Sequence, residues 1–180
     1  MTENRVPPNN NRSGRTPSGE LSLDAIDLSI LILLLRDARS SVRKIAAGVG
    51  MSAPAISERI ARLERHGVLR GYRAEVDWAR LGYGVTAYLM ITGVQGWEQA
   101  ETVGALRALR EVESVEVVTG TADLVVKLRV RSQAHLRDCL FDSIWKVPGV
   151  HRTETMICLS DDSAKPFSLE LAESLREEAR

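Results

Sequence analysis

Residues 44–64, KIAAGVGMSAPAISERIARLE, contain two short helix-forming runs separated by a Gly-Met-Ser break. Gly50 permits the positive φ of a tight turn, and Ser52 is placed to cap the second run. Ala46 has the small side chain that two closely crossing helices require where they touch. A short helix, a glycine turn and a second, serine-capped helix are typical of a helix-turn-helix unit, whose helices cross at about 90 to 120°.

The segment before this unit is strongly apolar. A helix capped by Ser22 or Asp24 is expected there. Its helical period is carried by Ile26, Ile30, Leu33 and Leu34. Further leucine and isoleucine residues at other angles mean that this helix must be covered on much of its circumference.

Two more helices are expected in the same domain. The first begins at Ser40 or Ser41 and runs to about residue 47, and the second covers residues 52–66, where Gly67 ends it. Residues 21–67 therefore predict a winged-type, three-helix DNA-binding domain.

The last of these helices has the pattern of a recognition helix. Ile56, Ile60 and Leu63 share one face and point into the bundle, so the opposite face is open to solvent. That outer face begins with small side chains, which let a helix N-terminus approach the DNA major groove. The candidate DNA-binding residues are Ser41, Arg43, Ser52, Pro54, Ala55, Ser57, Glu58, Arg59 and Arg62.

Local charge supports this interpretation. The whole chain has a formal net charge of zero, whereas residues 41–73 hold seven basic residues against two acidic ones. The positive charge is thus concentrated at the helical unit, as expected for contact with phosphates. The alternative is a plain three-helix bundle with a solvated basic face.

In the remainder of the chain, the spacing of the apolar residues changes. Residues 68–84 are predicted to be a linker with strand character, and residues 85–160 show strands and helices in the order βαββαβ. This order favours an α+β ferredoxin-like sandwich of four antiparallel strands with two helices on one face. Since the strand over residues 85–94 is apolar on both faces, the uncovered face predicts pairing with the sheet of a second copy.

The two ends of the chain differ from these domains. Residues 1–20 are polar, lack an apolar period and predict a flexible tail, whose scattered arginines either brush phosphates or are merely solvated. Residues 161–180 predict an extension with an amphipathic helix, which places Phe167, Leu171 and Leu175 on one face. This helix packs either on its own domain or on a neighbour.

Other classes of protein find little support. No segment resembles a signal peptide or is apolar for long enough to cross a bilayer, so a cytoplasmic protein without membrane contact is expected. Cys139 and Cys158 form no zinc or disulfide pattern. Cys139 follows His135 by four residues, but its apolar neighbours favour packing over nucleophilic chemistry. No catalytic or metal site and no cofactor is predicted, and the chain is not expected to be an enzyme.

Taken in order, the motifs resemble a known family. The runs LDAIDLSILILLLRDARSS, IAAGVGMSAPAISERIARLERHGVLRGYRAEVD, LGY, VTGTADLVVKL, PGV and a final T-E-T strand are similar to the Lrp/AsnC (feast/famine) transcription regulators. The resemblance covers about residues 21–160. It implies a ligand-binding domain that dimerises through its sheet, octamers of four dimers, and amino acids as effectors. Glu58 departs from the polar or basic residue that the family often has on the recognition face.

The loop TGTAD is the candidate effector site. Threonine hydroxyls, free N–H groups and the Asp123 carboxylate complement the carboxylate and ammonium of an amino acid. The alternative is a hairpin turn that Asp123 merely caps. The resemblance implies a ligand cleft between two subunits, and the candidate effector-binding residues are Thr119, Gly120, Thr121, Ala122 and Asp123.

We therefore expect a sequence-specific DNA-binding transcriptional regulator that responds to a small effector, an amino acid, and whose partners are double-stranded DNA and further copies of itself. Two alternatives from other classes remain at this point. One is an architectural protein that coats DNA without an effector, and the other is a metabolic enzyme built on the ferredoxin-like domain.

Overall fold

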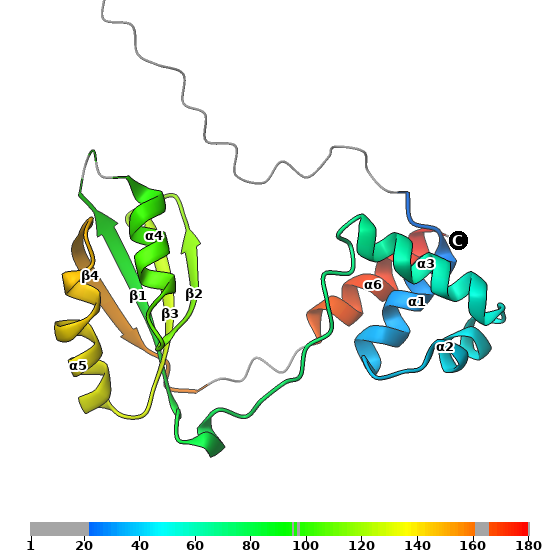
Figure 1. Ribbon diagram of the computed structural model, residues 1–180, viewed down its shortest axis with the longest axis horizontal. Helices are drawn as coiled ribbons and strands as arrows, with labels where there is room; N and C mark the ends of the chain where they lie inside the picture. The colour runs from blue at the N-terminus through cyan, green and yellow to red at the C-terminus, as the bar shows by residue number, and fades with distance from the viewer. Residues whose placement is uncertain (1–21, 95, 97, 161–165, 180) are drawn as a thin grey trace, which may run out of the picture. The chain divides into compact units, whose positions relative to one another are not determined.

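The computed structural model describes residues 22–94, 96, 98–160 and 166–179. These form two compact units: residues up to 73 together with residues from 165 onwards, and residues 74–164 (Figure 1). The expected tail over residues 1–20 lies outside the described residues. None of the helices in the described part of the chain is long and apolar enough to cross a bilayer.

The described part of the first unit consists of four helices. They are α1 (Ala25–Arg36), α2 (Val42–Val49), α3 (Ala53–Arg65) and α6 (Phe167–Glu178). Side chains cap three of them at their N-termini: Asp24 for α1, Ser41 for α2 and Ser52 for α3. These caps satisfy N–H groups that have no partner inside the helix, and so they set where each helix begins.

The turn between α2 and α3 confirms the predicted helix-turn-helix. Gly50 ends α2 in the left-handed conformation, with φ of 75°, and its N–H donates to the carbonyl oxygen of Ala46. Gly48 allows a second close approach, since a Cβ there would lie 3.3 Å from Leu33 Cδ1 of α1. The small residues of α2 therefore let the neighbouring helices approach without a steric clash.

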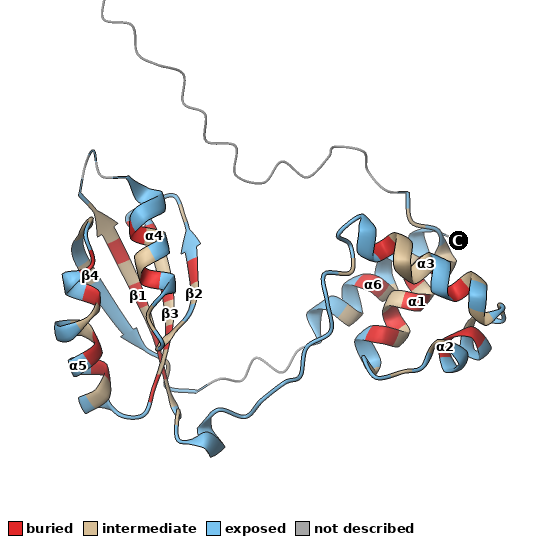
Figure 2. Cartoon of the chain, viewed as in Figure 1, coloured by how far each residue is buried: buried red, intermediate tan, exposed pale blue. Residues whose placement is uncertain are grey.

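Apolar side chains from α1, α2 and α3 form one core. The buried members are Ile30, Leu34, Ile45, Ala46, Ile56 and Leu63. Ile60, expected in the same wedge, is only partly buried and packs against the edge of this core. Figure 2 shows the buried residues following the inner sides of the helices.

Helix α6 packs along α1 within this unit. The residue that α6 buries is Ala172, which is 7% exposed. The expected apolar stripe of Phe167, Leu171 and Leu175 is 43 to 65% exposed. The helix therefore lies against α1 by its small residue, while its larger apolar side chains remain partly open to solvent.

The second unit has the predicted βαββαβ order. Its elements are η1 (Ala79–Leu81), β1 (Val85–Gly93), α4 (Gln99–Arg107), β2 (Val112–Val117), β3 (Leu124–Val130), α5 (Gln133–Asp142), η2 (Ile144–Lys146) and β4 (Val150–Ile157). The strands form an antiparallel sheet in the order β2-β3-β1-β4. This is the ferredoxin-like arrangement.

One face of the sheet is covered by both helices. Ala87, Leu89 and Ile91 of β1 are fully buried, in one core with Leu106 of α4 and Leu136 of α5. The alternate side chains of β1 are less buried, as the apolar pattern on both faces of this strand predicts. The linker over residues 68–84 is fully described, and its only regular element is η1.

The wedge between α1, α2 and α3 yields a prediction. We expect Ile56→Ala to lower the free energy of unfolding by about 2 to 5 kcal/mol, because it leaves a cavity at a side chain that is 0% exposed. Ile60→Ala should cost less, since that side chain is only partly buried. Urea unfolding of both variants measures the difference, and equal losses would contradict this account of the core.

Candidate functional site

The N-terminus of α3 presents a small, exposed surface. Ser52 caps the helix, its hydroxyl oxygen accepting from the N–H of Ala55 at 3.4 Å, and Pro54 occupies the first turn. Ser57 is exposed one turn further on. The serine caps of α2 and α3 accept with their oxygens, so each hydroxyl proton is available for an external acceptor such as a phosphate.

The predicted DNA-binding residues do not all lie on this surface. Ser41, Arg43, Ser52, Pro54, Ser57 and Glu58 are exposed, whereas Ala55, Arg59 and Arg62 are partly buried. The last two arginines turn towards α1.

A buried carboxylate holds these two arginines. Asp27 of α1 has a fully buried side chain, and its two oxygens accept from Arg59 Nη1 at 2.8 Å and from Arg62 Nη2. Arg59 Nη1 also donates to Asp24 at 2.7 Å. A carboxylate without water must be paired by charge and hydrogen bonds. The network therefore fastens α3 to the start of α1.

The network also shifts ionisation equilibria. Burial raises the pKa of Asp24, but the backbone N–H of Asp27 and the guanidinium of Arg59 lower it by more, so that its pKa lies below the usual value. Conversely, hydrogen bonds to Asp24 and Asp27 raise the pKa of Arg59. Each charge favours the ionised form of its partner.

Asp27 is a residue that sequence reasoning missed. It lies three residues before Ile30 and seven before Leu34, both of which are buried, and so it occupies a core position of α1. A lone aspartate in an apolar stripe, with arginines in the neighbouring helix, was the available signal. Its effect is that Arg59 and Arg62 are engaged inside the domain.

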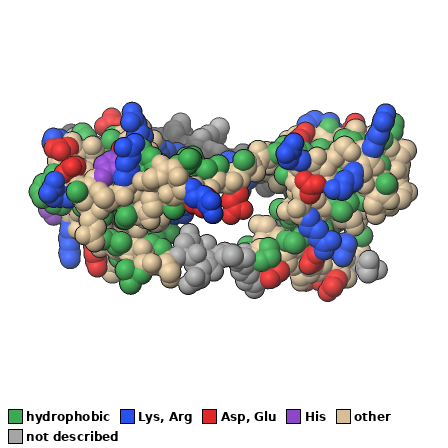
Figure 3. All heavy atoms as spheres, turned by 90° about the horizontal axis from the view of Figure 1, so that it is seen from below, with side chains coloured by type: hydrophobic (Ala, Val, Ile, Leu, Met, Phe, Trp, Pro, Cys, Tyr) green, Lys and Arg blue, Asp and Glu red, His purple; other side chains and the backbone are tan. Residues whose placement is uncertain are grey.

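Pairing also reduces the positive charge of the surface. Lys44 pairs with Asp37 at 3.0 Å and Arg65 with Glu58 at 3.0 Å, in addition to the pairs of Asp27. On the side shown in Figure 3, Lys and Arg side chains of the first unit lie beside Asp and Glu. The basic residues of the 41–73 segment that form no ion pair within the described residues are Arg43, Arg70 and Arg73.

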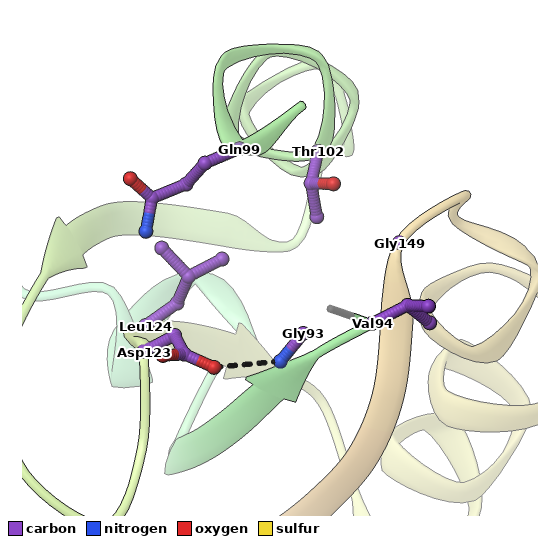
Figure 4. Close-up of a pocket in the computed structure, with 7 residues that line it drawn as sticks. All are labelled: Gly93, Val94, Gln99, Thr102, Asp123, Leu124 and Gly149. Atoms are coloured by element: carbon purple, nitrogen blue, oxygen red, sulfur yellow. Dashed lines mark hydrogen bonds between the residues drawn. The ribbon is translucent and has the colours of Figure 1, made fainter. Parts of the chain in front are cut away.

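A second candidate site is a pocket in the second unit. It has a volume of about 280 Å³ and is lined by Gly93, Val94, Gln99, Thr102, Asp123, Leu124 and Gly149. Figure 4 shows Gln99 and Thr102 reaching it from α4, and Asp123 and Leu124 from the start of β3. The pocket thus lies where the ends of β1, β3 and β4 meet the first turn of α4.

Hydrogen bonds hold the walls of this pocket together. Asp123 Oδ2 accepts from the N–H of Gly93 at 2.8 Å, and the N–H of Val94 donates to the carbonyl oxygen of Gly149 at 2.9 Å. The Thr102 hydroxyl donates to the carbonyl oxygen of Pro148 at 2.9 Å. Figure 4 shows this hydrogen bond from Gly93 to one Asp123 oxygen, and among the described residues the other oxygen accepts no hydrogen bond.

The predicted effector loop only partly coincides with the pocket. Of its five residues, Asp123 lines the pocket and Ala122 is buried beside it, while Thr119, Gly120 and Thr121 form the exposed turn. Among the described residues, the N–H groups of that turn have no hydrogen-bond acceptor. Gln99 and Thr102 were not foreseen, because α4 and the loop are brought together only by folding.

The pair of Cys139 and His135 does not form a nucleophilic site. Burial, and secondarily the charge of Glu111, raises the pKa of the Cys139 thiol to about 11, which keeps it protonated. His135 faces Glu111 instead, with Nε2 at 3.3 Å from its carboxylate. Cys139 belongs to the core of the unit, as its apolar neighbours predicted.

Comparison with known families matches both units. The family model of the AsnC-type helix-turn-helix domain matches residues 23–64, and that of the Lrp/AsnC ligand binding domain matches residues 86–164. Helix α6 lies beyond both matched segments.

Individual proteins agree with the family models. The chain is 37% identical over 139 residues to the HTH-type transcriptional regulator FL11 of Pyrococcus abyssi, covering 77% of this chain and 91% of that protein. It is 34% identical to the leucine-responsive regulatory protein of Haemophilus influenzae, covering 78% of this chain and 86% of that protein.

Solved structures are similar over the same extent. Escherichia coli AsnC superposes with a TM-score of 0.75 at 26% identity, covering 81% of this chain and 97% of that chain. The feast or famine regulatory protein of Mycobacterium tuberculosis, complexed with L-methionine, superposes with a TM-score of 0.74 at 30% identity, covering 80% of this chain and 97% of that chain.

The Asp27 network yields a stability prediction. Asp27→Ala should lower the free energy of unfolding by about 3 to 5 kcal/mol, because it breaks a buried ion-pair network, leaves Arg62 without its carboxylate partner and leaves Arg59 with Asp24 alone. Arg62→Ala should cost less, since Arg59 still neutralises Asp27. Urea unfolding measures both values.

Glu58→Ala is the matched control, because its pair with Arg65 is exposed and contributes little. If Asp27→Ala were as stable as this control, the network would not fasten α3.

Proposed function

Because this chain belongs to the Lrp/AsnC family of transcriptional regulators, we propose that α3 binds a specific double-stranded DNA sequence and that an amino acid in the second unit alters this binding. The observation that carries the proposal is the combination of an exposed, serine-capped N-terminus of α3 with an internal ion-pair network that fixes its orientation. The relatives are named as transcriptional regulators, so the enzyme alternative has no support.

The DNA contacts follow from exposure and pairing. We assign base-edge contacts to the exposed face of α3, at Pro54, Ser57 and Glu58, with Ala55 at its edge, because a helix with short side chains enters the major groove closely. We assign the phosphate contacts to Ser41 and Ser52, which cap α2 and α3, and to Arg43. Arg59 and Arg62 act mainly by holding α3 in place, with only their remaining donors free for DNA.

The effector proposal rests on the pocket beside Asp123. Its free carboxylate oxygen suits an ammonium group, and the turn N–H groups of Thr119, Gly120 and Thr121 suit a carboxylate. The small volume, about 280 Å³, suits a ligand of amino-acid size. A similar protein was solved with L-methionine bound, which supports the same chemical class here.

The assembly proposal rests on exposed apolar surface. On the face of the sheet opposite the helices, Met156 of β4 is 46% exposed and pairs with Tyr88 of β1, and Tyr88 and Met90 are only partly buried. We propose that the uncovered side of the sheet pairs with a second copy, forming a homodimer that can assemble further into an octamer of four dimers. A two-fold dimer places two recognition helices on one pseudo-palindromic site.

Arg43→Ala tests the phosphate contact. Using DNA selected from a random library by the wild-type protein, we expect weaker binding to all sequences and a salt dependence reduced by about one charge, because one phosphate contact is lost. Arg107→Ala, which removes an exposed arginine of the second unit, is the control. A salt slope that is unchanged in Arg43→Ala would remove Arg43 from the interface.

Asp123 tests the effector pocket. In a thermal-shift panel of the twenty amino acids, a ligand at about 100 times its dissociation constant should stabilise the wild type by about 2.7 kcal/mol. Asp123→Asn keeps an acceptor for the Gly93 N–H but removes the charge, and Asp123→Ala removes both. Both variants should lose the shift while retaining effector-free DNA binding.

Asp142→Ala, which alters an exposed carboxylate of α5, should respond as the wild type does. Full ligand affinity in Asp123→Ala, measured by calorimetry, would place the effector elsewhere.

A further inference from the structure

We propose that the outer face of α1 is a docking surface for α6, and that this docking joins the DNA-binding unit to the ligand-binding unit a second time. Occupancy of the effector pocket would then reach α3 through α6 as well as through the linker. The coupling part of this inference rests on the function proposed above, whereas the docking part does not.

The outer face of α1 needs a partner. Leu28 and Ile32 lie one turn apart and are 4% and 2% exposed, yet they are outside the core that α1 shares with α2 and α3. Their side of the helix faces away from Ile30 and Leu34. Without α6, a helix with two apolar faces would leave this one in water, at a cost of transfer free energy.

Helix α6 fits that face by shape and charge. Ala172 lets the two helix backbones approach closely, and Arg36 Nη2 of α1 donates to Glu173 Oε1 of α6 at 2.6 Å. The two helices also line a common groove, with Leu28 and Leu35 on one wall and Leu171 on the other. The contact is therefore an apolar interface with an ion pair at its rim.

Helix α6 lies outside the parts of the chain that the family models match, whereas α1 lies within them. The matched helix-turn-helix segment ends at residue 64 and the matched ligand-binding segment at residue 164, whereas α6 begins at Phe167. The helix-turn-helix unit of this chain thus contains a fourth helix that follows the ligand-binding unit in the sequence.

The connections leave the ligand-binding unit from neighbouring strands. The linker enters at the start of β1, and the chain continues towards α6 from the end of β4. These two points are adjacent, since Ala87 pairs with Ile157 and the N–H of Cys158 donates to the carbonyl oxygen of Thr86 at 2.9 Å.

The opposite ends of the same two strands border the effector pocket. There Gly93 pairs with Val150, and the Val94 N–H donates to Gly149. A ligand that shifts β4 against β1 at the pocket therefore moves the two connections relative to each other. Because α6 is docked, that movement acts on α1, and the Asp27 network carries it to α3.

The test uses full-length variants of α6. Ala172→Glu places a charge in the buried contact, and Ser174→Glu places the same charge on an exposed position of the same helix as the control. Arg36→Glu and Glu173→Arg each break the ion pair, and the double variant restores it with reversed charges.

Hydrogen exchange of α1 measures docking. We expect amide exchange in α1 to rise at least tenfold in Ala172→Glu, to rise less in the two single charge reversals, to recover in the double variant and to stay unchanged in Ser174→Glu. The docking would be overturned if amide exchange in α1 were unchanged in Ala172→Glu and if the effects of the two charge reversals on exchange simply added in the double variant.

The second readout is coupling, measured as the change in DNA dissociation constant caused by the amino acid that most stabilises the wild type in the twenty-member panel. We expect Ala172→Glu to bind that amino acid but to lose most of the change, while Ser174→Glu retains it. A full response in Ala172→Glu with raised α1 exchange would overturn the coupling. If no amino acid affects the wild type, the proposed effector function and the coupling both fail, and exchange alone decides the docking.

Discussion

The apolar character of α1 is the constraint on which the first unit depends, because a helix with apolar side chains on opposite faces is stable only when both faces are covered. Helices α2 and α3 cover the face of Ile30 and Leu34, and α6 covers the face of Leu28 and Ile32. Asp27 is the exception within α1, a buried carboxylate that requires positive partners. These positive partners come from α3. The contact between α1 and α3 therefore includes directional ion pairs in addition to apolar packing, which alone would tolerate rotation of α3. The orientation of the recognition helix is thereby linked to the packing of α1.

Features governed by local chemistry were predictable from the sequence. Gly50 as the turn residue and Ser41 and Ser52 as helix caps depend on backbone conformation and on N–H groups a few residues away. The order βαββαβ likewise follows from the change of apolar period along the chain. The packing of α6 on α1 was not predictable, since the ion pair of Arg36 with Glu173 joins residues 137 positions apart.

The candidate sites show the same division. Residue type and spacing predict the small, serine-capped start of α3 on the surface. They also predict Arg59 and Arg62 as DNA contacts, because the partner of these two arginines, Asp27, lies 32 and 35 positions away in an apolar stretch. In the second unit, the loop sequence predicts Asp123, which lines the pocket, whereas Gln99 and Thr102 join it only through the fold. The chain thus combines a recognition helix, held in place by ion pairs, with a small pocket at one end of β1 and β4. The other ends of these two strands lead to the two connections between the units.

A footprint of the full-length protein on DNA selected from a random library, with and without the stabilising amino acid, tests the central claim most directly. A two-fold regulator with an amino-acid effector should protect a discrete, pseudo-palindromic site with half-sites separated by about one helical turn or a multiple of it, and the protection should change when the amino acid is added. Uniform protection along the DNA that is indifferent to every amino acid would contradict this claim, and would identify an architectural protein instead.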